Sequence, residues 1–145
     1  MFIRYSLKWA QGRGIQTYHY TSNTSVYPQD GGVSVDETAD TSEAPPTGQV
    51  LCESERLLAD AGDAFGAWYV LRLAGIYGPG RHYLLDLLRS GASVIPGVGD
   101  TLLNLIHRDD VVAAICTALA HPQSATSGIY NVADNQPATK AELVA

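Results

Sequence analysis

Hydrophobic and polar positions along the chain alternate between helical and strand-like patterns. Residues 2–11 carry apolar side chains at helical spacing, and Gly12 and Gly14 then end the predicted helix. Residues 68–73 form an apolar run interrupted only by Arg72, which is typical of a strand covered on both faces. The pattern also predicts helices over 48–64, 83–90 and from Asp109 or Asp110 to Ala120, strands over 17–20, 102–106 and 128–132, a loop over 28–46, and a last helix that begins at the capping box Thr139 to Glu142.

This alternation of strands and helices predicts an α/β fold built on a parallel sheet with right-handed crossovers. The pattern looks incomplete at both ends, because no strand precedes the helix at 2–11 and the helix at Thr139 has no room to finish. We therefore expect one partial domain over residues 1–145. Neither Gly12-Arg13-Gly14 nor Gly97-Val98-Gly99 lies between a strand and a helix, as a dinucleotide-binding turn requires. The phosphate-binding half of a doubly wound sheet is expected to be missing.

The segment from Leu71 to Arg81, LRLAGIYGPGR, is where a buried strand breaks into a Gly/Pro turn. In an open α/β sheet, ligands bind beyond the carboxyl ends of the strands because the loops diverge there. Glycine lets the backbone approach such a ligand closely. This loop is the first candidate for a ligand site.

The composition narrows the range of functions. With 145 residues, 46% hydrophobic and 17% charged, the chain fits one soluble globular domain. The net charge of −6, the pI of about 5.0 and the scattered Lys and Arg residues disfavour nucleic-acid binding. No stretch predicts a membrane span or a signal peptide. Cys52 and Cys116 lack metal-ligand spacing, so we predict no metal site and expect reduced packing residues in a cytoplasmic protein.

Four sequence motifs occur together in one order and at suitable spacings. They are YTSNTSVYP at 20–28, LRLAGIYGPGR at 71–81, NLIHRDD at 104–110 and YNVADNQPAT at 130–139. This set resembles the carboxyl-terminal half of an extended short-chain dehydrogenase/reductase, the NAD-dependent epimerase/dehydratase family. GGVSVDE at 31–37 further resembles the atypical members of that family.

The resemblance implies a partial Rossmann-like, doubly wound parallel sheet that lacks its first strands. Residues 1–80 would form the end of that sheet. Residues 81–145 would form a small substrate-side α/β portion with one returning strand. The resemblance also implies NAD or NADP as cofactor, bound only with the missing amino-terminal half, which would carry the glycine fingerprint.

The family's catalytic groups have counterparts in this chain that lack the usual chemistry. The resemblance implies a Ser or Thr after the fifth strand and a Tyr-x-x-x-Lys on the next helix, where the lowered Tyr pKa allows proton transfer during hydride transfer. With the helix aligned on Glu55, Thr47 takes the Tyr position and Leu51 the Lys position. Asn23 takes the Ser or Thr position. The usual catalytic set is absent, and His107 is the candidate substitute acid/base.

Two groups of ligand-binding residues are implied by the same resemblance. The residues expected to border the nicotinamide are Thr21, Ser22, Asn23, Leu73, Ala74, Gly75 and Ile76. Tyr77, Arg81 and His107 are expected on the substrate side, facing a small polar ligand. Members that bind nucleotide sugars often carry an Asn and an Arg where this chain has Gly75 and Leu103. A nucleotide-sugar substrate is therefore not favoured.

Several of these residues also have a purely structural interpretation. Arg81 fits a solvated loop arginine, and His107 fits a structural histidine at the end of a strand. Asp109 and Asp110 are better interpreted as helix caps than as an acid/base pair.

Two tyrosines and two acidic residues also have structural interpretations. Tyr27 and Tyr77 each end a motif and could border the pocket, although ring burial is the commoner reason for such positions. Asp36 and Glu37 lie in the predicted loop and are expected to be solvated.

Three functional hypotheses remain from the sequence. The first is an NAD(P)-binding oxidoreductase-like protein of epimerase/dehydratase type that acts on or senses a small polar, sugar-like metabolite. The second is a non-catalytic NAD(P) sensor or scaffold, and the third is a non-functional gene fragment. Helices 2–11 and 49–61 are the expected contacts of a homodimer.

Overall fold

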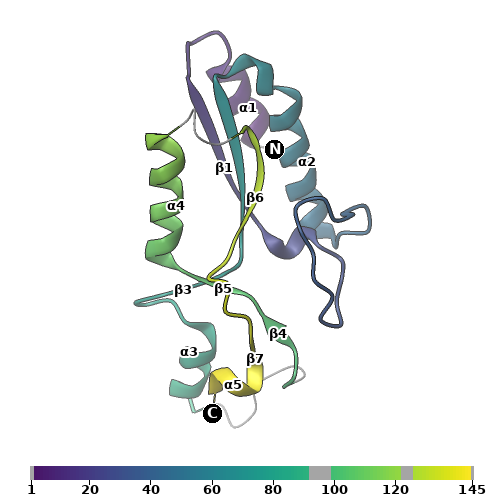
Figure 1. Cartoon of the computed structure of the whole chain (residues 1–145), viewed down its shortest axis with the longest axis vertical. Coiled ribbons are helices and arrows are strands. Elements are labelled where there is room, and N and C mark those ends of the chain that lie inside the picture. The colour runs from purple at the N-terminus through teal and green to yellow at the C-terminus, as the bar shows by residue number, and fades with distance from the viewer. Residues whose placement is uncertain (1, 92–98, 122–125, 145) are drawn as a thin grey trace.

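A three-stranded parallel sheet lies at the centre of the computed structural model, which describes residues 2–91, 99–121 and 126–144 (Figure 1). The strands follow the order β1, β2, β6, with the bounds Thr17–Asn23, Ala67–Leu73 and Gly128–Val132. Three longer helices cover the sheet: α1 (Phe2–Ala10), α2 (Pro46–Asp60) and α4 (Arg108–Ala120). The predicted α/β fold with a parallel sheet is confirmed.

Strand β2 separates two hydrophobic cores because its side chains alternate between the faces of the sheet. Tyr69 and Leu71 join the core under α4, whereas Val70 joins the core under α1 and α2. The prediction that this strand is covered on both faces is therefore confirmed. Its register with both neighbours runs through Tyr69 to Leu73.

The remaining elements form a smaller layer beyond the carboxyl ends of the sheet strands (Figure 1). They are β3 (Gly75–Tyr77), α3 (Tyr83–Arg89), β4 (Leu102–Leu103), β5 (Leu105–His107), β7 (Ala138–Thr139) and α5 (Lys140–Val144). Strand β3 pairs with β5 in parallel, and β4 pairs with β7 antiparallel.

The single strand predicted over 102–106 is wrong. Asn104 interrupts it, and its carbonyl accepts a hydrogen bond from the Gly75 amide at 3.0 Å. The two halves pair with different strands, so alternation within the segment did not reveal the break.

Other predicted boundaries differ less. Strand β1 continues beyond Tyr20 to Asn23, where the 3₁₀ turn η1 (Thr24–Val26) begins. Helix α2 ends at Asp60 and is followed by a separate 3₁₀ turn, η2 (Gly62–Ala64). The capping box is confirmed, since the Glu142 amide donates to Thr139 Oγ1 at 3.2 Å and the Thr139 amide donates to Glu142 Oε2 at 2.8 Å.

The predictions for the two cysteines and for the two Gly-x-Gly segments have different outcomes. Cys52 is half-buried, but Cys116 is exposed on α4 and is not a packing residue here. Gly12 and Gly14 adopt positive φ angles in the turn after α1. Gly97 and Val98 lie outside the described residues.

Within the described ranges, no helix is long and apolar enough to cross a membrane. Across those same ranges, no group of three or more His, Cys, Asp or Glu side chains is arranged to hold a metal ion.

Candidate functional site

A cavity of about 550 Å³ lies at the carboxyl ends of β1 and β2, and we call it the strand-end cavity. Its lining residues are Thr21, Ser22, Asn23, Thr24, Ser25, Leu73, Ala74, Gly75, Ile76 and Arg81. All seven residues that were expected to border the nicotinamide are in this set. The structure thus brings together two segments separated by about fifty residues of sequence, as the parallel arrangement of β1 and β2 requires.

Hydrogen bonds and a close backbone approach shape the ends of β1 and β2 where they line the strand-end cavity. Asn23 Oδ1 accepts the Ser25 amide at 2.9 Å, which turns the chain from β1 into η1. On the neighbouring strand, the Ala74 amide donates to the Val132 carbonyl at 3.0 Å. A Cβ atom at Gly75 would lie 3.0 Å from Leu105 Cδ2, so glycine allows β3 and β5 to approach closely.

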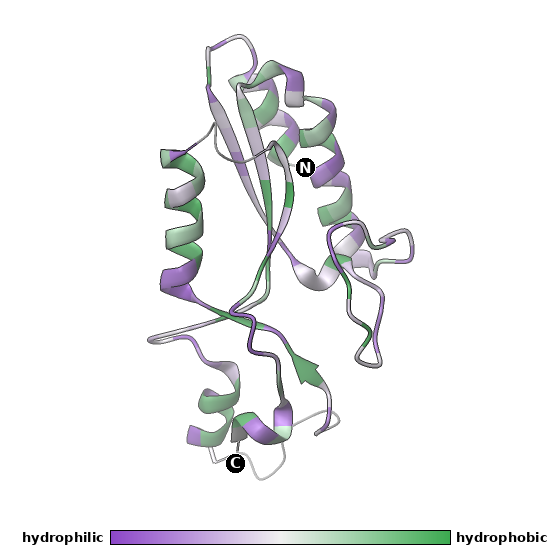
Figure 2. Ribbon diagram, viewed as in Figure 1, coloured by the Kyte–Doolittle hydropathy of each residue, from purple (hydrophilic) through white to green (hydrophobic). Residues whose placement is uncertain are grey.

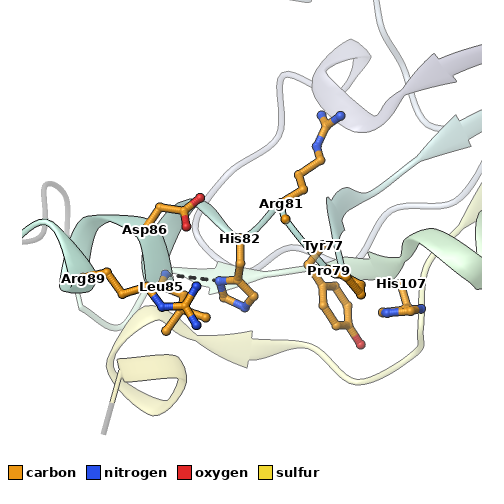
Figure 3. A pocket seen from close by; sticks show the side chains of 10 residues that line it. Tyr77, Pro79, Arg81, His82, Leu85, Asp86, Arg89 and His107 are labelled. Carbon is orange, nitrogen blue, oxygen red and sulfur yellow. Dashed lines mark hydrogen bonds between the residues drawn. The ribbon is translucent and has the colours of Figure 1, made fainter.

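A second cavity of about 280 Å³ lies beside the first, and we call it the loop cavity. It is lined by Tyr77, Gly78, Pro79, Gly80, Arg81, His82, Leu85, Asp86, Arg89 and His107 (Figure 3). The three expected substrate-side residues are all among them. The Tyr77 ring centroid lies 6.0 Å from that of His82 and 5.2 Å from that of His107, both in edge-to-face arrangements.

Arg81 belongs to the lining of both cavities. Figure 3 shows its guanidinium extending away from the rings of Tyr77, His82 and His107. Its side chain is exposed, and among the described residues no carboxylate forms an ion pair with it. The geometry leaves this charge available to an anionic group.

Both histidines of the loop cavity act as helix N-caps. His82 Nδ1 accepts the Leu85 amide at 3.2 Å, and His107 Nδ1 accepts the Asp109 amide at 3.2 Å. A ring nitrogen that accepts cannot carry the proton, so in the neutral ring the proton sits on Nε2. Each ring therefore presents Nε2–H as a hydrogen-bond donor.

The cap of α4 corrects one prediction and supports another. Asp109 and Asp110 do not cap this helix. They lie in its first turn, where carboxylates interact favourably with the helix dipole. His107 has the structural role that its position at the end of a strand suggested, and it also lines the loop cavity.

A buried ion pair lies behind the strand-end cavity and was not identified from the sequence. Arg72 Nη2 and Glu55 Oε2 are 2.7 Å apart, and their side chains are 5% and 3% exposed. The Ser22 hydroxyl donates to Glu55 Oε1 at 2.6 Å, so Ser22 borders the cavity while its side chain faces α2. Burial alone would lower the pKa of Arg72, but hydrogen bonds to Glu55 and Tyr27 outweigh it and raise that pKa.

The same network holds two residues that were expected elsewhere. Tyr27 does not border either cavity. Its hydroxyl accepts from Arg72 at 2.9 Å and donates to Asn131 Oδ1 at 2.7 Å. Glu37 is not simply solvated, because its Oε1 accepts the Asn131 amide at 2.7 Å. An arginine inside an apolar strand was the one sequence signal of this network.

The two remaining family positions lie apart from the cavities. Thr47 and Leu51 are on the first turns of α2 and line neither cavity. That end of α2 packs against η1, where a Cβ atom on Gly48 would lie only 2.4 Å from the Ser25 carbonyl oxygen.

A parallel sheet with helices on both faces defines an α/β protein, and the two cavities lie beyond the carboxyl ends of its strands. A family model for the NAD dependent epimerase/dehydratase family matches residues 4–133. The chain belongs to this family.

Individual relatives match over part of their length. Protein YeeZ of Escherichia coli (strain K12) is 36% identical over 113 residues, which are 78% of this chain and 38% of that protein. The structure of a putative NAD-dependent epimerase/dehydratase from Methylobacillus flagellatus is 31% identical with a TM-score of 0.74, over 89% of this chain and 45% of that one. UDP-glucuronic acid 4-epimerase from Bacillus cereus, solved with NAD, shares the fold at 19% identity and a TM-score of 0.87, over 99% of this chain and 49% of that one. The chain thus spans between about a third and a half of these relatives.

Proposed function

We propose that this chain forms the ligand-binding half of an NAD(P)-linked, oxidoreductase-like protein of epimerase/dehydratase type. The observation that carries the proposal is the position of the strand-end cavity. It gathers the expected nicotinamide-bordering residues at the carboxyl ends of two parallel strands and shares Arg81 with a second cavity. In doubly wound folds this edge of the sheet is where dinucleotides and their substrates bind.

The residues present fit only part of an NAD(P) molecule. Thr21 to Asn23 and Leu73 to Ile76 offer backbone groups together with polar and apolar side chains for the nicotinamide end. The sequence has no Gly-x-Gly-x-x-Gly turn for the pyrophosphate, so that part of the cofactor would bind to a segment outside this chain. When bound, the cofactor would supply hydride transfer.

The loop cavity is proposed to hold a small polar, sugar-like ligand. His82 and His107 each offer an Nε2–H donor there, and Arg81 offers a charge between the two cavities. Gly75 and Leu103 stand where nucleotide-sugar binders of the family often carry Asn and Arg, so a nucleotide-sugar ligand is not favoured.

Binding without turnover is the second candidate, and the state of His107 favours it. Because Nδ1 accepts the Asp109 amide, Nε2 carries the proton and cannot act as a base in that tautomer. Thr47 and Leu51 cannot substitute, since neither lines a cavity and neither titrates near neutral pH. An NAD(P)-responsive binding protein would need none of these groups to transfer protons.

The test joins this chain to the amino-terminal half of the Methylobacillus relative in one polypeptide. We expect calorimetry to show NAD or NADP binding by the fusion and none by the 145-residue chain alone. Arg81→Glu should weaken cofactor binding at least tenfold. Arg89→Glu, which makes the same charge change on an exposed residue of the loop cavity only, should leave cofactor binding unchanged.

Turnover separates the two candidates. Hydride transfer at about 1 per second or faster on a panel of sugars and carbonyl compounds would support the oxidoreductase. Cofactor binding with no detectable turnover would support the binding protein. Absence of cofactor binding by a folded fusion would contradict both.

A further inference from the structure

Three polar side chains form a row across the carboxyl end of the central sheet, and we call it the polar row. Ser22 on β1 is the register partner of Arg72 on β2, and Arg72 is the partner of Asn131 on β6. Register partners in neighbouring parallel strands point their side chains to the same face of a sheet. Each of the three comes one position before the last residue of its strand. The polar row therefore lies beside the strand-end cavity, which Ser22 also lines.

Two glutamates from outside the sheet bind the two ends of the polar row. Glu55 of α2 accepts hydrogen bonds from Ser22 at 2.6 Å and from Arg72 at 2.7 Å. Glu37 Oε1 accepts the Asn131 amide at 2.7 Å, on the outer strand in the order β1, β2, β6. An edge strand presents backbone amides without a ladder partner, and here the carboxylate takes the place of that partner. The row is thereby fastened at both sides of the sheet.

Tyr27 joins the two ends of the polar row. Its hydroxyl accepts a hydrogen bond from Arg72 at 2.9 Å and donates one to Asn131 Oδ1 at 2.7 Å. The central carbon of the Arg72 guanidinium also lies 5.0 Å from the centre of the Tyr27 ring. Linked hydrogen bonds in a poorly solvated site strengthen one another, so the loss of one partner weakens the next bond. A continuous chain of hydrogen bonds thus runs from Glu37 to Ser22.

Glu37 lies in residues 28–45, the long loop that precedes α2, and we call this loop the strap (Figure 1). The strap has internal contacts of its own, because Gln29 Nε2 donates to the Asp40 carbonyl at 2.8 Å and joins its two limbs. The Glu37 carbonyl lies 3.5 Å from Arg72 Nη1. Both the side chain and the main chain of Glu37 therefore contact the polar row, and this residue joins the strap to the sheet.

We propose that Glu37 is a positioning residue for the strand-end cavity. Its carboxylate fixes Asn131, and the chain of hydrogen bonds then holds Ser22 and the end of β1 in place. Ser22 and the neighbouring Asn23 line the cavity, so a shift of this strand end changes the cavity wall. Glu37 lines neither cavity and acts through these other residues. The proposal rests on the proposed function for the ligand that the wall contacts, whereas the coupling along the chain does not depend on it.

Amide hydrogen exchange in the 145-residue chain tests the coupling. We expect Glu37→Ala to speed exchange in residues 21–25 at least tenfold while exchange in α1, across a different part of the core, stays unchanged. Glu37→Gln should restore slow exchange, because its side-chain oxygen can still accept the Asn131 amide. Glu43→Ala makes the same change at an exposed glutamate of the strap. This matched control should leave exchange unchanged.

Tyr27→Phe tests the route of the coupling with a second variant. It removes the hydroxyl between Arg72 and Asn131 but leaves the Glu37 carboxylate in place. Exchange in residues 21–25 should speed up, whereas the Asn131 amide should stay protected. The proposal is overturned by unchanged exchange in residues 21–25 in either variant. Acceleration shared equally by α1 also overturns it, because that result reports general unfolding.

The fusion with the amino-terminal half of the Methylobacillus relative separates this proposal from the proposed function. In a fusion that binds NAD or NADP, Glu37→Ala should weaken cofactor binding at least tenfold, and Glu37→Gln and Glu43→Ala less than twofold. Unchanged affinity in Glu37→Ala would overturn the positioning role. A folded fusion without cofactor affinity would contradict the proposed function, and the exchange result would then decide whether Glu37 holds the cavity wall.

Discussion

At the scale of single residues, the Arg72–Glu55 ion pair is buried, with side chains 5% and 3% exposed. Glu55 receives hydrogen bonds from Arg72 and from the Ser22 hydroxyl, and Arg72 also donates to Tyr27. The pair thereby ties α2 to both β1 and β2 just below the strand-end cavity. Loss of either charge would leave the other buried without a counterion.

Glu55→Gln should therefore lower the free energy of unfolding by about 3–5 kcal/mol, measured by urea denaturation. The control is Glu53→Gln, two residues away on the same helix. Glu53 pairs with Arg4 at 2.6 Å, but those side chains are 42% and 56% exposed. Glu53→Gln should therefore lower the free energy of unfolding by no more than about 1 kcal/mol. Equal losses in the two variants would show that the buried pair has no special role.

At the scale of the elements, histidine caps begin both helices that border the loop cavity. The caps fix α3 and α4 relative to Tyr77, whose ring lies between the two imidazoles. His82 and His107 thus each cap a helix and also line the loop cavity. A substitution at either histidine must distinguish its effect on the cap from its effect on a ligand.

His107→Ala should destabilise the protein by about 1 kcal/mol because the first turn of α4 loses an acceptor. His107→Asn should retain most of the stability, since the Asn side-chain oxygen can accept the Asp109 amide. Amide exchange at Asp109 and Asp110 would report the cap directly. If Asp109→Ala or Asp110→Ala opened these amides more than His107→Ala did, the assignment of the cap would be wrong.

At the scale of the whole molecule, apolar surface remains exposed on both sides of the sheet. Phe2, Tyr5 and Trp9 form an exposed aromatic row on α1, across the sheet from the exposed Val112 and Leu119 of α4 (Figure 1). Figure 2 shows that apolar residues continue along α4 after its hydrophilic first turn. Such surfaces commonly mark contacts with other chains. We propose that α1 and α2 form the contacts of a homodimer.

Sedimentation of the purified chain should accordingly show concentration-dependent self-association. Tyr5→Lys combined with Trp9→Lys should shift the chain toward monomer by adding charge to the aromatic row. The variant Val112→Asp with Leu119→Asp is the control and should leave a dimer through α1 and α2 intact. A monomer at all concentrations, or dissociation only in the control, would contradict this interface.

The sequence by itself determined the features that depend on neighbouring residues. The apolar run of β2, the capping box at Thr139 and the Gly/Pro turn after Leu73 are local patterns, and each was found where predicted. The two groups of cavity residues were named from the resemblance to the family. They lie together because parallel strands place their carboxyl ends at one edge, and their ligands stay a proposal.

Only the tertiary structure decided which distant residues meet. Glu55 and Arg72 are 17 positions apart, and Tyr27 and Asn131 are 104 apart, so no local pattern pairs them. The break at Asn104 likewise depends on strands that pair across the fold. Short-range periodicity records which face of an element is buried, whereas hydrogen-bond partners are chosen when the elements pack.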